Sequence, residues 1–120
     1  MKKLTKAEEE IMQVIWALDR CTVSDVISKL GTPRPPHSTI SSIVRILEKK
    51  GFVDHKAYGR TYEYFPIVDK DQYGKNRLQQ LVSNYFEGSM ERLVSHIVAK
   101  EDVDMDSLKK LIDELPEDEN

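Results

Sequence analysis

Small hydroxyl and cationic side chains recur through residues 38–51 in a pattern that could read a nucleic acid. If this stretch is a helix, its outer face has no carboxylate except Glu48 at the margin. Short hydroxyl side chains and an arginine can reach base edges in the DNA major groove without holding the backbone away. The pattern favours a DNA recognition helix, although a plain amphipathic helix fits the same spacing. The residues assigned to DNA contact are Ser38, Thr39, Ser41, Ser42, Arg45 and Lys49.

Other reactive residue types do not form a recognisable site. The histidines His37, His55 and His96 lack metal-ligand spacing, and Cys21 is the single cysteine. The serines and threonines fall at predicted helix caps and on the predicted recognition helix, with no paired base and no glycine-rich phosphate loop. We therefore expect a protein that is not an enzyme and that needs no metal or cofactor, with a buried or half-buried thiol at position 21.

Composition indicates one small globular protein of 120 residues, with 39% hydrophobic and 32% charged residues. No apolar run approaches the roughly 18 residues that a bilayer span requires, and the first residues lack a signal-peptide core. We expect a cytoplasmic protein that does not insert into membranes.

Charge is divided unevenly along the chain, whose total net charge is -3. Residues 1–68 hold 11 Lys and Arg against 8 Asp and Glu, whereas residues 69–120 hold 7 against 13. A basic first part and an acidic second part predict a DNA-binding face on the first part, since the acidic part would repel a phosphate backbone.

Two helices are predicted before the recognition helix. Thr5 and Glu8 form a capping-box pattern that starts a helix over 6–19, whose apolar face includes Ala7, and Trp16 is expected in the core. A second start signal at Thr22 predicts a short helix over 23–30. The proline-rich connector that follows leads into the third helix, whose Ile40, Ile43, Val44 and Leu47 have core-facing spacing. This order is that of a helix-turn-helix.

A β-hairpin is predicted directly after the third helix. Residues 52–57 and 61–66 are aromatic and β-branched runs, and Gly59 between them suits a tight turn. A basic hairpin beside a recognition helix is the arrangement that holds flanking phosphates in a winged helix. A surface hairpin with solvated cations is the alternative, and the adjacency of helix and hairpin favours DNA binding. The predicted wing contacts are Lys56, Tyr58, Arg60 and Thr61.

Three further helices are predicted in the second part: over 70–87, over the residues after Ser89, and over 105–115. Their apolar stripes lie beyond a complete winged-helix unit and are too short to form a stable core alone. We expect a DNA-binding domain over 1–68 and a helical dimerisation domain over 69–120, because a two-fold dimer presents paired recognition helices. The predicted dimer contacts are Leu78, Leu81, Val82, Tyr85, Phe86, Leu93, Ile97, Leu108, Leu111 and Ile112.

The sequence resembles the BlaI/MecI-type repressors, which regulate penicillinase and methicillin resistance. The resemblance runs nearly end to end and rests on these stretches: Leu4 to Glu8 with Ile15 and Trp16, Ser38 to Ile40, Leu47 to Lys56, Gly59 to Tyr64, and Val98 to Asp102. It implies a homodimeric winged-helix repressor that binds a double-stranded operator. It also implies relief by a membrane sensor protease system that leads to cleavage in the dimerisation region.

Three departures from the family pattern qualify what the resemblance implies. The best-known members are cleaved at an Asn-Phe bond, and the matching position here is His96 and Ile97, which implies either that this chain is not induced by proteolysis or that its protease has an altered preference. The family often has an arginine at the place of Ile46, whereas the arginine here is Arg45, so the operator sequence is expected to differ. A C-terminal cysteine motif for copper is absent from the sequence, which disfavours copper sensing.

The predicted fold is therefore mainly α with a small β-hairpin, a winged helix-turn-helix followed by a helical dimerisation region. The predicted function is repression by steric occupation of a promoter. The alternative is a winged-helix protein-protein interaction module that does not bind DNA directly. A steep fall of affinity with salt would favour DNA over a mainly apolar protein interface.

Overall fold

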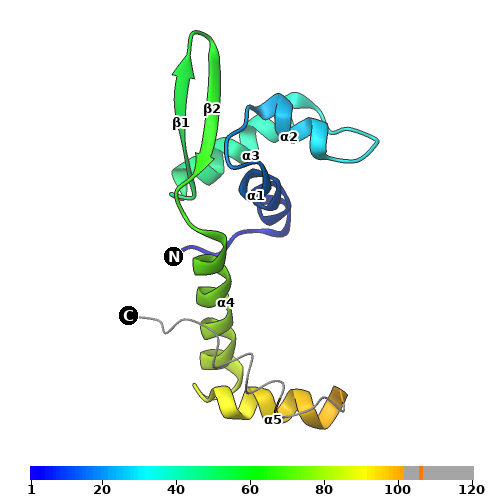
Figure 1. Ribbon diagram of the computed structural model, residues 1–120, viewed down its shortest axis with the longest axis vertical. Coiled ribbons are helices and arrows are strands. Elements are labelled where there is room, and N and C mark those ends of the chain that lie inside the picture. Colours follow the sequence, from blue (N-terminus) through cyan, green and yellow to red (C-terminus); the bar gives the residue numbers. More distant parts are fainter. Residues whose placement is uncertain (102–105, 107–120) are drawn as a thin grey trace. The chain divides into compact units, whose positions relative to one another are not determined.

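The computed structural model describes residues 1–101 and residue 106 and is mainly helical there, with one antiparallel hairpin (Figure 1). The elements are α1 (Lys6–Leu18), α2 (Val23–Lys29), α3 (His37–Lys49), β1 (Val53–Tyr58), β2 (Thr61–Pro66), α4 (Lys70–Tyr85) and α5 (Met90–Glu101). The predicted fold class is confirmed. Apart from residue 106, the helix predicted over 105–115, with Leu108, Leu111 and Ile112, lies outside the described residues.

The chain divides into two compact units, Met1–Tyr73 and Gly74–Asn120. The first unit contains α1 to β2 and the first turn of α4, and the second contains the rest of α4 and α5. None of the described helices combines the length and apolar character needed to cross a membrane.

Capping boxes start both α1 and α2, as predicted. The Thr5 hydroxyl accepts a hydrogen bond from the Glu8 backbone N–H at 3.2 Å, and the Glu8 carboxylate accepts one from the Thr5 N–H at 3.0 Å. Thr22 and Asp25 make the same reciprocal pair, at 3.1 and 2.9 Å. These bonds satisfy backbone donors that have no partner within a helix, so local sequence fixes both helix starts.

The core of the first unit lies between α1, α2, α3 and the hairpin. Ile40, Val44 and Leu47 are buried and Ile43 is partly buried, as predicted for α3. The prediction for α1 was wrong at Ala7, which is exposed. Leu4, which is 2% exposed, packs in the core near this end of α1. Because Leu4 precedes the helix, helical spacing could not predict its burial. The remaining core residues are Ile11, Met12, Ile15, Cys21, Val23, Val26, Phe52, Val53, Tyr64 and Tyr73.

The hairpin pairs Val53 with Pro66 at its base and Tyr58 with Thr61 beside the turn. Gly59 in the turn has φ 62°, a conformation that other residues rarely adopt. A short bridge anchors the hairpin to the α1–α2 connection: the Cys21 N–H donates to the Tyr64 carbonyl at 3.0 Å, and the Tyr64 N–H donates back at 2.7 Å. The turn end therefore projects beyond the helices while the base is fixed to them (Figure 1).

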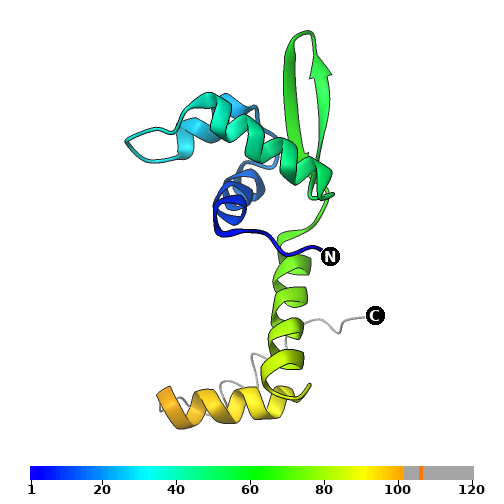
Figure 2. The same ribbon diagram turned by 180° about the vertical axis from the view of Figure 1, so that it is seen from behind.

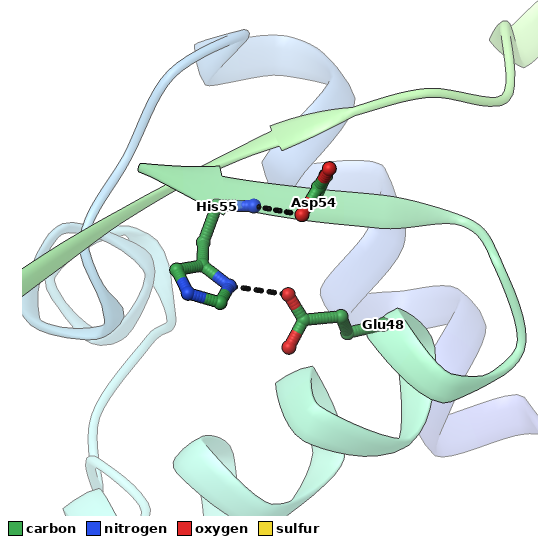
Figure 3. A group of neighbouring side chains, drawn as sticks. All are labelled: Glu48, Asp54 and His55. Atoms are coloured by element: carbon green, nitrogen blue, oxygen red, sulfur yellow. Dashed lines mark hydrogen bonds and ion pairs between the residues drawn. The ribbon is translucent and has the colours of Figure 1, made fainter. Parts of the chain in front are cut away.

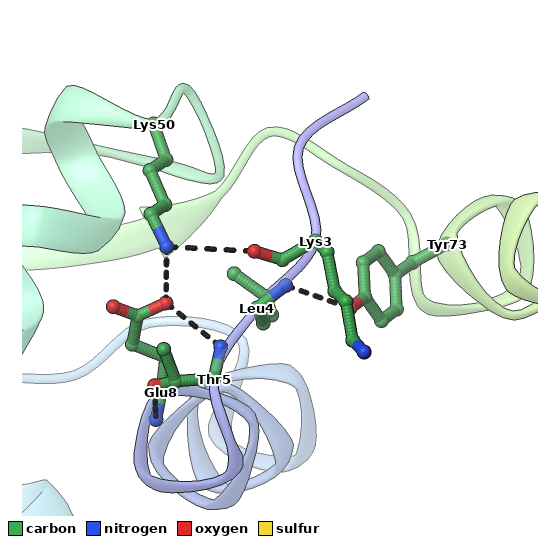
Figure 4. A network of polar contacts seen from close by, with 6 residues as sticks. All are labelled: Lys3, Leu4, Thr5, Glu8, Lys50 and Tyr73. Carbon is green, nitrogen blue, oxygen red and sulfur yellow. Dashed lines mark hydrogen bonds and ion pairs between the residues drawn. The ribbon is translucent and has the colours of Figure 1, made fainter.

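Tyr73, in the first turn of α4, closes the core of the first unit. Its hydroxyl oxygen accepts a hydrogen bond from the buried Leu4 backbone N–H at 3.0 Å (Figure 4). Its ring lies edge-on to Phe52, with centroids 5.4 Å apart, and 5.9 Å from the Trp16 ring. Trp16 itself is partly buried against the core, and its Nε1 donates to the Val68 carbonyl at 2.8 Å. The start of α4 is thereby attached to the winged unit.

Tyr73→Phe is expected to destabilise the protein by about 1 to 2 kcal/mol, because the buried Leu4 N–H loses its acceptor while the ring packing remains. Urea unfolding measures the change. Tyr58→Phe is the matched control, since Tyr58 is 54% exposed beside the hairpin turn, and it should leave stability unchanged. Equal stability of the two variants would contradict this role for the Tyr73 hydroxyl.

In the second unit, Glu87 and Gly88, both with positive φ, separate the two helices. The Ser89 hydroxyl accepts a hydrogen bond from the Arg92 backbone N–H at 3.2 Å and caps α5, the helix predicted after Ser89. The apolar residues of α4 are only partly buried: Val82 is 5% exposed, whereas Leu81 and Tyr85 are 42% and 76% exposed. An exposed apolar surface of this unit is therefore left on α4.

Candidate nucleic-acid interface

The predicted recognition residues do lie on the accessible side of α3, which runs from the proline-rich connector to the base of the hairpin (Figure 2). Ser41 is half-buried, and the others are exposed; these are Ser38, Thr39, Ser42, Arg45 and Lys49. The apolar stripe of the same helix is buried, so the hydroxyl and cationic face points away from the core. Ile46, which was not predicted as a DNA-contacting residue, is also 42% exposed on this helix.

The predicted wing residues are all exposed in the turn half of the hairpin. Lys56 lies on β1, and Arg60 lies in the turn between the paired Tyr58 and Thr61. Cations at this position can move toward a phosphate backbone without disturbing the core, because the base of the hairpin carries the buried residues Val53 and Tyr64.

A hollow of about 450 Å³ joins the two predicted surfaces. Arg45 from α3 and Arg60 from the wing both line it, together with Ser41 and Thr61. The remaining lining residues are Thr22, Val23, Ser24, His37, Tyr62 and Tyr64. Two guanidinium groups with several hydroxyls form a donor-rich surface suited to an anionic phosphate oxygen. Sequence reasoning had not placed the start of α2 in this site, because no local pattern predicts that contact.

A cluster of ionisable side chains fixes the end of α3 to β1 (Figure 3). The His55 Nδ1 pairs with the Glu48 carboxylate, and the Asp54 carboxylate accepts from the His55 backbone N–H at 2.8 Å. The His55 ring stacks on Tyr62 with centroids 4.4 Å apart. Glu48 is the acidic residue at the margin of the recognition face, and its carboxylate is paired with His55 of the same chain. The cluster braces the helix against the wing.

The same three side chains come closest, within the described part of the chain, to a set of metal ligands, with one ligand atom from each lying within 4.8 Å of the others. Glu48 and His55 face each other, and Asp54 faces the backbone. The ion pair and the backbone hydrogen bond therefore account for the close approach of these three side chains.

Cys21 is buried, as the sequence predicts. Burial, with the nearby carboxylates of Asp25 and Glu63, raises the pKa of its thiol to about 11. The thiol is therefore protonated at neutral pH, and its contribution here is to packing.

Three packed helices followed by an antiparallel hairpin, with the third helix exposed beside it, define a winged-helix protein. The solved DNA-binding domain of the repressor BlaI is similar to this chain, with a TM-score of 0.52 and 35% sequence identity, over 61% of this chain and 94% of that one. The sequence model of the penicillinase repressor family matches residues 4–117, and the chain belongs to this family.

Full-length relatives support the same assignment. The penicillinase repressor of Bacillus licheniformis is 27% identical over 124 residues, which cover 100% of this chain and 97% of the relative. The methicillin resistance regulatory protein MecI of Mammaliicoccus sciuri is 26% identical over 110 residues, which cover 91% of this chain and 89% of the relative. The similarity therefore includes the second unit as well as the winged helix.

Proposed function

We propose that this protein is a homodimeric transcriptional repressor that binds double-stranded operator DNA through α3 and the hairpin and excludes polymerase. The observation that carries the proposal is the set of exposed hydroxyls and cations on α3 and on the wing, with Arg45 and Arg60 lining one hollow. Membership of a family of repressors and similarity to the BlaI DNA-binding domain support it.

In this proposal the two elements have different roles. Arg45 and the exposed hydroxyls of α3 contact base edges in the major groove. Lys49, Lys56 and Arg60 contact phosphates, which set register and orientation but carry no sequence information. Tyr58 and Thr61 extend the wing contact from either side of the turn.

Dimerisation is proposed to occur through the second unit, whose exposed Leu81 and Tyr85 lie four residues apart on α4. Residues at this spacing share one helix face, and a two-fold axis would pair that face with its copy. The other residues of the same unit assigned to the proposed interface are half-buried; they are Leu78, Phe86, Leu93 and Ile97.

Relief of repression by proteolysis at His96 and Ile97 remains a proposal that the family resemblance carries, with a membrane sensor protease system as partner. Both residues lie inside α5. Cleavage there is expected to depend on local opening of the helix, because proteolysis of folded proteins proceeds from transiently opened states.

The direct test of the function is titration with the DNA upstream of the gene and with a scrambled duplex, at two salt concentrations, with the mass of the complex measured. We expect preferential binding of two chains per site and a steep loss of affinity with salt. Equal binding of both duplexes, or none, would refute the repressor function and favour the protein-interaction module.

Arg45→Ala is expected to weaken binding to the preferred duplex by about 1 to 3 kcal/mol and to relax the preference at one base position. Competition with single-position variants of the duplex measures both effects. Lys56→Ala is the comparison, because a lost phosphate contact should weaken all sequences alike and reduce the salt slope by about one. If Arg45→Ala weakened binding to all sequences alike and reduced the salt slope by about one, Arg45 would be a phosphate contact within the hollow and not a base contact.

A further inference from the structure

One large apolar side chain interrupts the hydroxyl and cationic face of α3. Ile46 is 42% exposed, whereas the other large apolar residues of this helix are buried or half-buried against the core. It follows Ser42 by four residues and precedes Lys49 by three, so the three side chains are neighbours on the helix surface. Ser42 and Lys49 are both exposed. The proposed DNA-contacting surface thus contains an apolar element.

Single exposed apolar residues are common on protein surfaces and need no special explanation. Ile46 differs in its surroundings, because the proposed function brings this face against the major groove. There its side chain is removed from water whatever the base sequence. An isoleucine offers no hydrogen bond, so a base edge opposite it that presents only donors and acceptors would be left unpaired. The position therefore discriminates among bases.

The major groove has a matching apolar feature, the C5-methyl group of thymine. Two properties suit Ile46 to contact it. Its β-branched side chain has few rotamers on a helix, so little freedom is lost on binding. The small Ser42 beside it leaves the side chain accessible on the helix surface.

We propose that Ile46 reads a thymine methyl group in each half-site of the operator. The inference rests on the proposed function and goes beyond it by assigning base chemistry to one residue. Removing one buried methyl group is expected to lower affinity about three- to fivefold, which is the scale of burying one such group.

The test deletes the methyl group from the DNA and not only the side chain from the protein. A high-affinity duplex is first selected from a random pool with the full chain. Each thymine of one half-site is then replaced singly by deoxyuridine, which lacks the methyl group and keeps the base-pair hydrogen bonds. For the natural sequence we expect one position at which this replacement lowers affinity about three- to fivefold.

Ile46→Ala is expected to bind the selected duplex more weakly and to lose most of the sensitivity at that position. Ile46→Val, which keeps a branched side chain, should retain much of it. Ser42→Ala is the control from the same face, and it should remain as sensitive to the deoxyuridine replacement as the natural sequence. Circular dichroism verifies that each variant is folded, which we expect because these side chains are exposed.

The outcomes separate the inference from the function on which it rests. Selection that enriches no sequence would refute the proposed function. Specific binding that is unaffected by every deoxyuridine replacement would overturn the inference alone. A sensitive thymine whose effect is the same in the natural sequence and in Ile46→Ala would also overturn it, because another residue would then contact the methyl group.

Discussion

The double variant Leu81→Glu/Tyr85→Glu is expected to be monomeric and to bind a two-half-site operator about 10²- to 10⁴-fold more weakly than the natural sequence. The size of the loss follows from effective concentration: when two half-sites are bound by one dimer, the second binding event is intramolecular. Both side chains are exposed on α4, so the substitutions place carboxylates on the proposed apolar interface. Sedimentation and titration with the operator measure the two effects.

The control is Gln79→Glu/Ser83→Glu, which adds the same two charges, also four residues apart, at exposed polar positions of α4. It should remain dimeric and bind normally, which would exclude net charge as the cause. A dimeric Leu81→Glu/Tyr85→Glu protein would show that these residues lie outside the interface. A monomeric Leu81→Glu/Tyr85→Glu protein that still bound the operator tightly would show that tight binding does not require a dimer on both half-sites.

Features set by neighbouring residues could be predicted from the sequence of the first unit. The starts of α1 and α2 were predicted to the residue, because a capping box needs only Thr5 with Glu8 or Thr22 with Asp25. The α3 stripe and the position of the hairpin turn follow in the same way from helical spacing and from Gly59. Each of these signals spans fewer than ten residues, so tertiary packing has little scope to change it.

Contacts between distant residues could not be predicted. The Leu4 N–H finds its acceptor on Tyr73, 69 residues away, and Lys50 finds Glu8 across 42 residues. The local sequence predicts the capping-box role of Glu8 but not its buried ion pair with Lys50. The pairing of Glu48 with His55 was missed for a different reason, since its short separation crosses from helix to strand and has no fixed spacing.

The candidate interface shows the same division. Helical spacing placed Ser38, Ser42, Arg45 and Lys49 on the exposed face, as the structure has them. The hollow lined by Arg45 and Arg60 depends on how the hairpin packs beside α3. The spacing of residues along the sequence does not determine that packing. The sequence does contain a signal for Ile46: it falls outside the apolar stripe, between two polar positions of the exposed face, and it stands where the resembling family often has an arginine.

The second large expected effect concerns the buried charge of the first unit. The Glu8 side chain is 9% exposed, and Lys50 at the end of α3, 22% exposed, contacts its carboxylate with the ammonium group while also donating to the Lys3 carbonyl (Figure 4). Burial by itself would raise the pKa of the Glu8 carboxyl. The Lys50 ammonium and the hydrogen bonds of Thr5 outweigh burial and lower the pKa below its ordinary value.

Lys50→Met is therefore expected to lower the free energy of unfolding by about 2 to 4 kcal/mol at neutral pH, because the Glu8 carboxylate stays buried without its cation. Lys49→Met is the matched control, since it removes the same charge from the adjacent, exposed residue, and it should change stability little. Denaturant unfolding of the two variants makes the comparison. Similar losses in both would show that the Glu8–Lys50 contact contributes no more than an exposed lysine does.

The acid dependence of stability gives an independent test of the same pair. Because folding lowers the pKa of Glu8, the unfolded chain binds more protons between the two pKa values, and stability rises with pH there. The contribution is complete above the ordinary glutamate pKa of about 4.3 and is lost as pH falls through the folded value. Glu8→Gln keeps an oxygen for the capping box and cannot titrate, so its unfolding free energy should fall less over this acid range. Parallel acid profiles for the two proteins would show that Lys50 does not hold the Glu8 carboxylate ionised in the folded state.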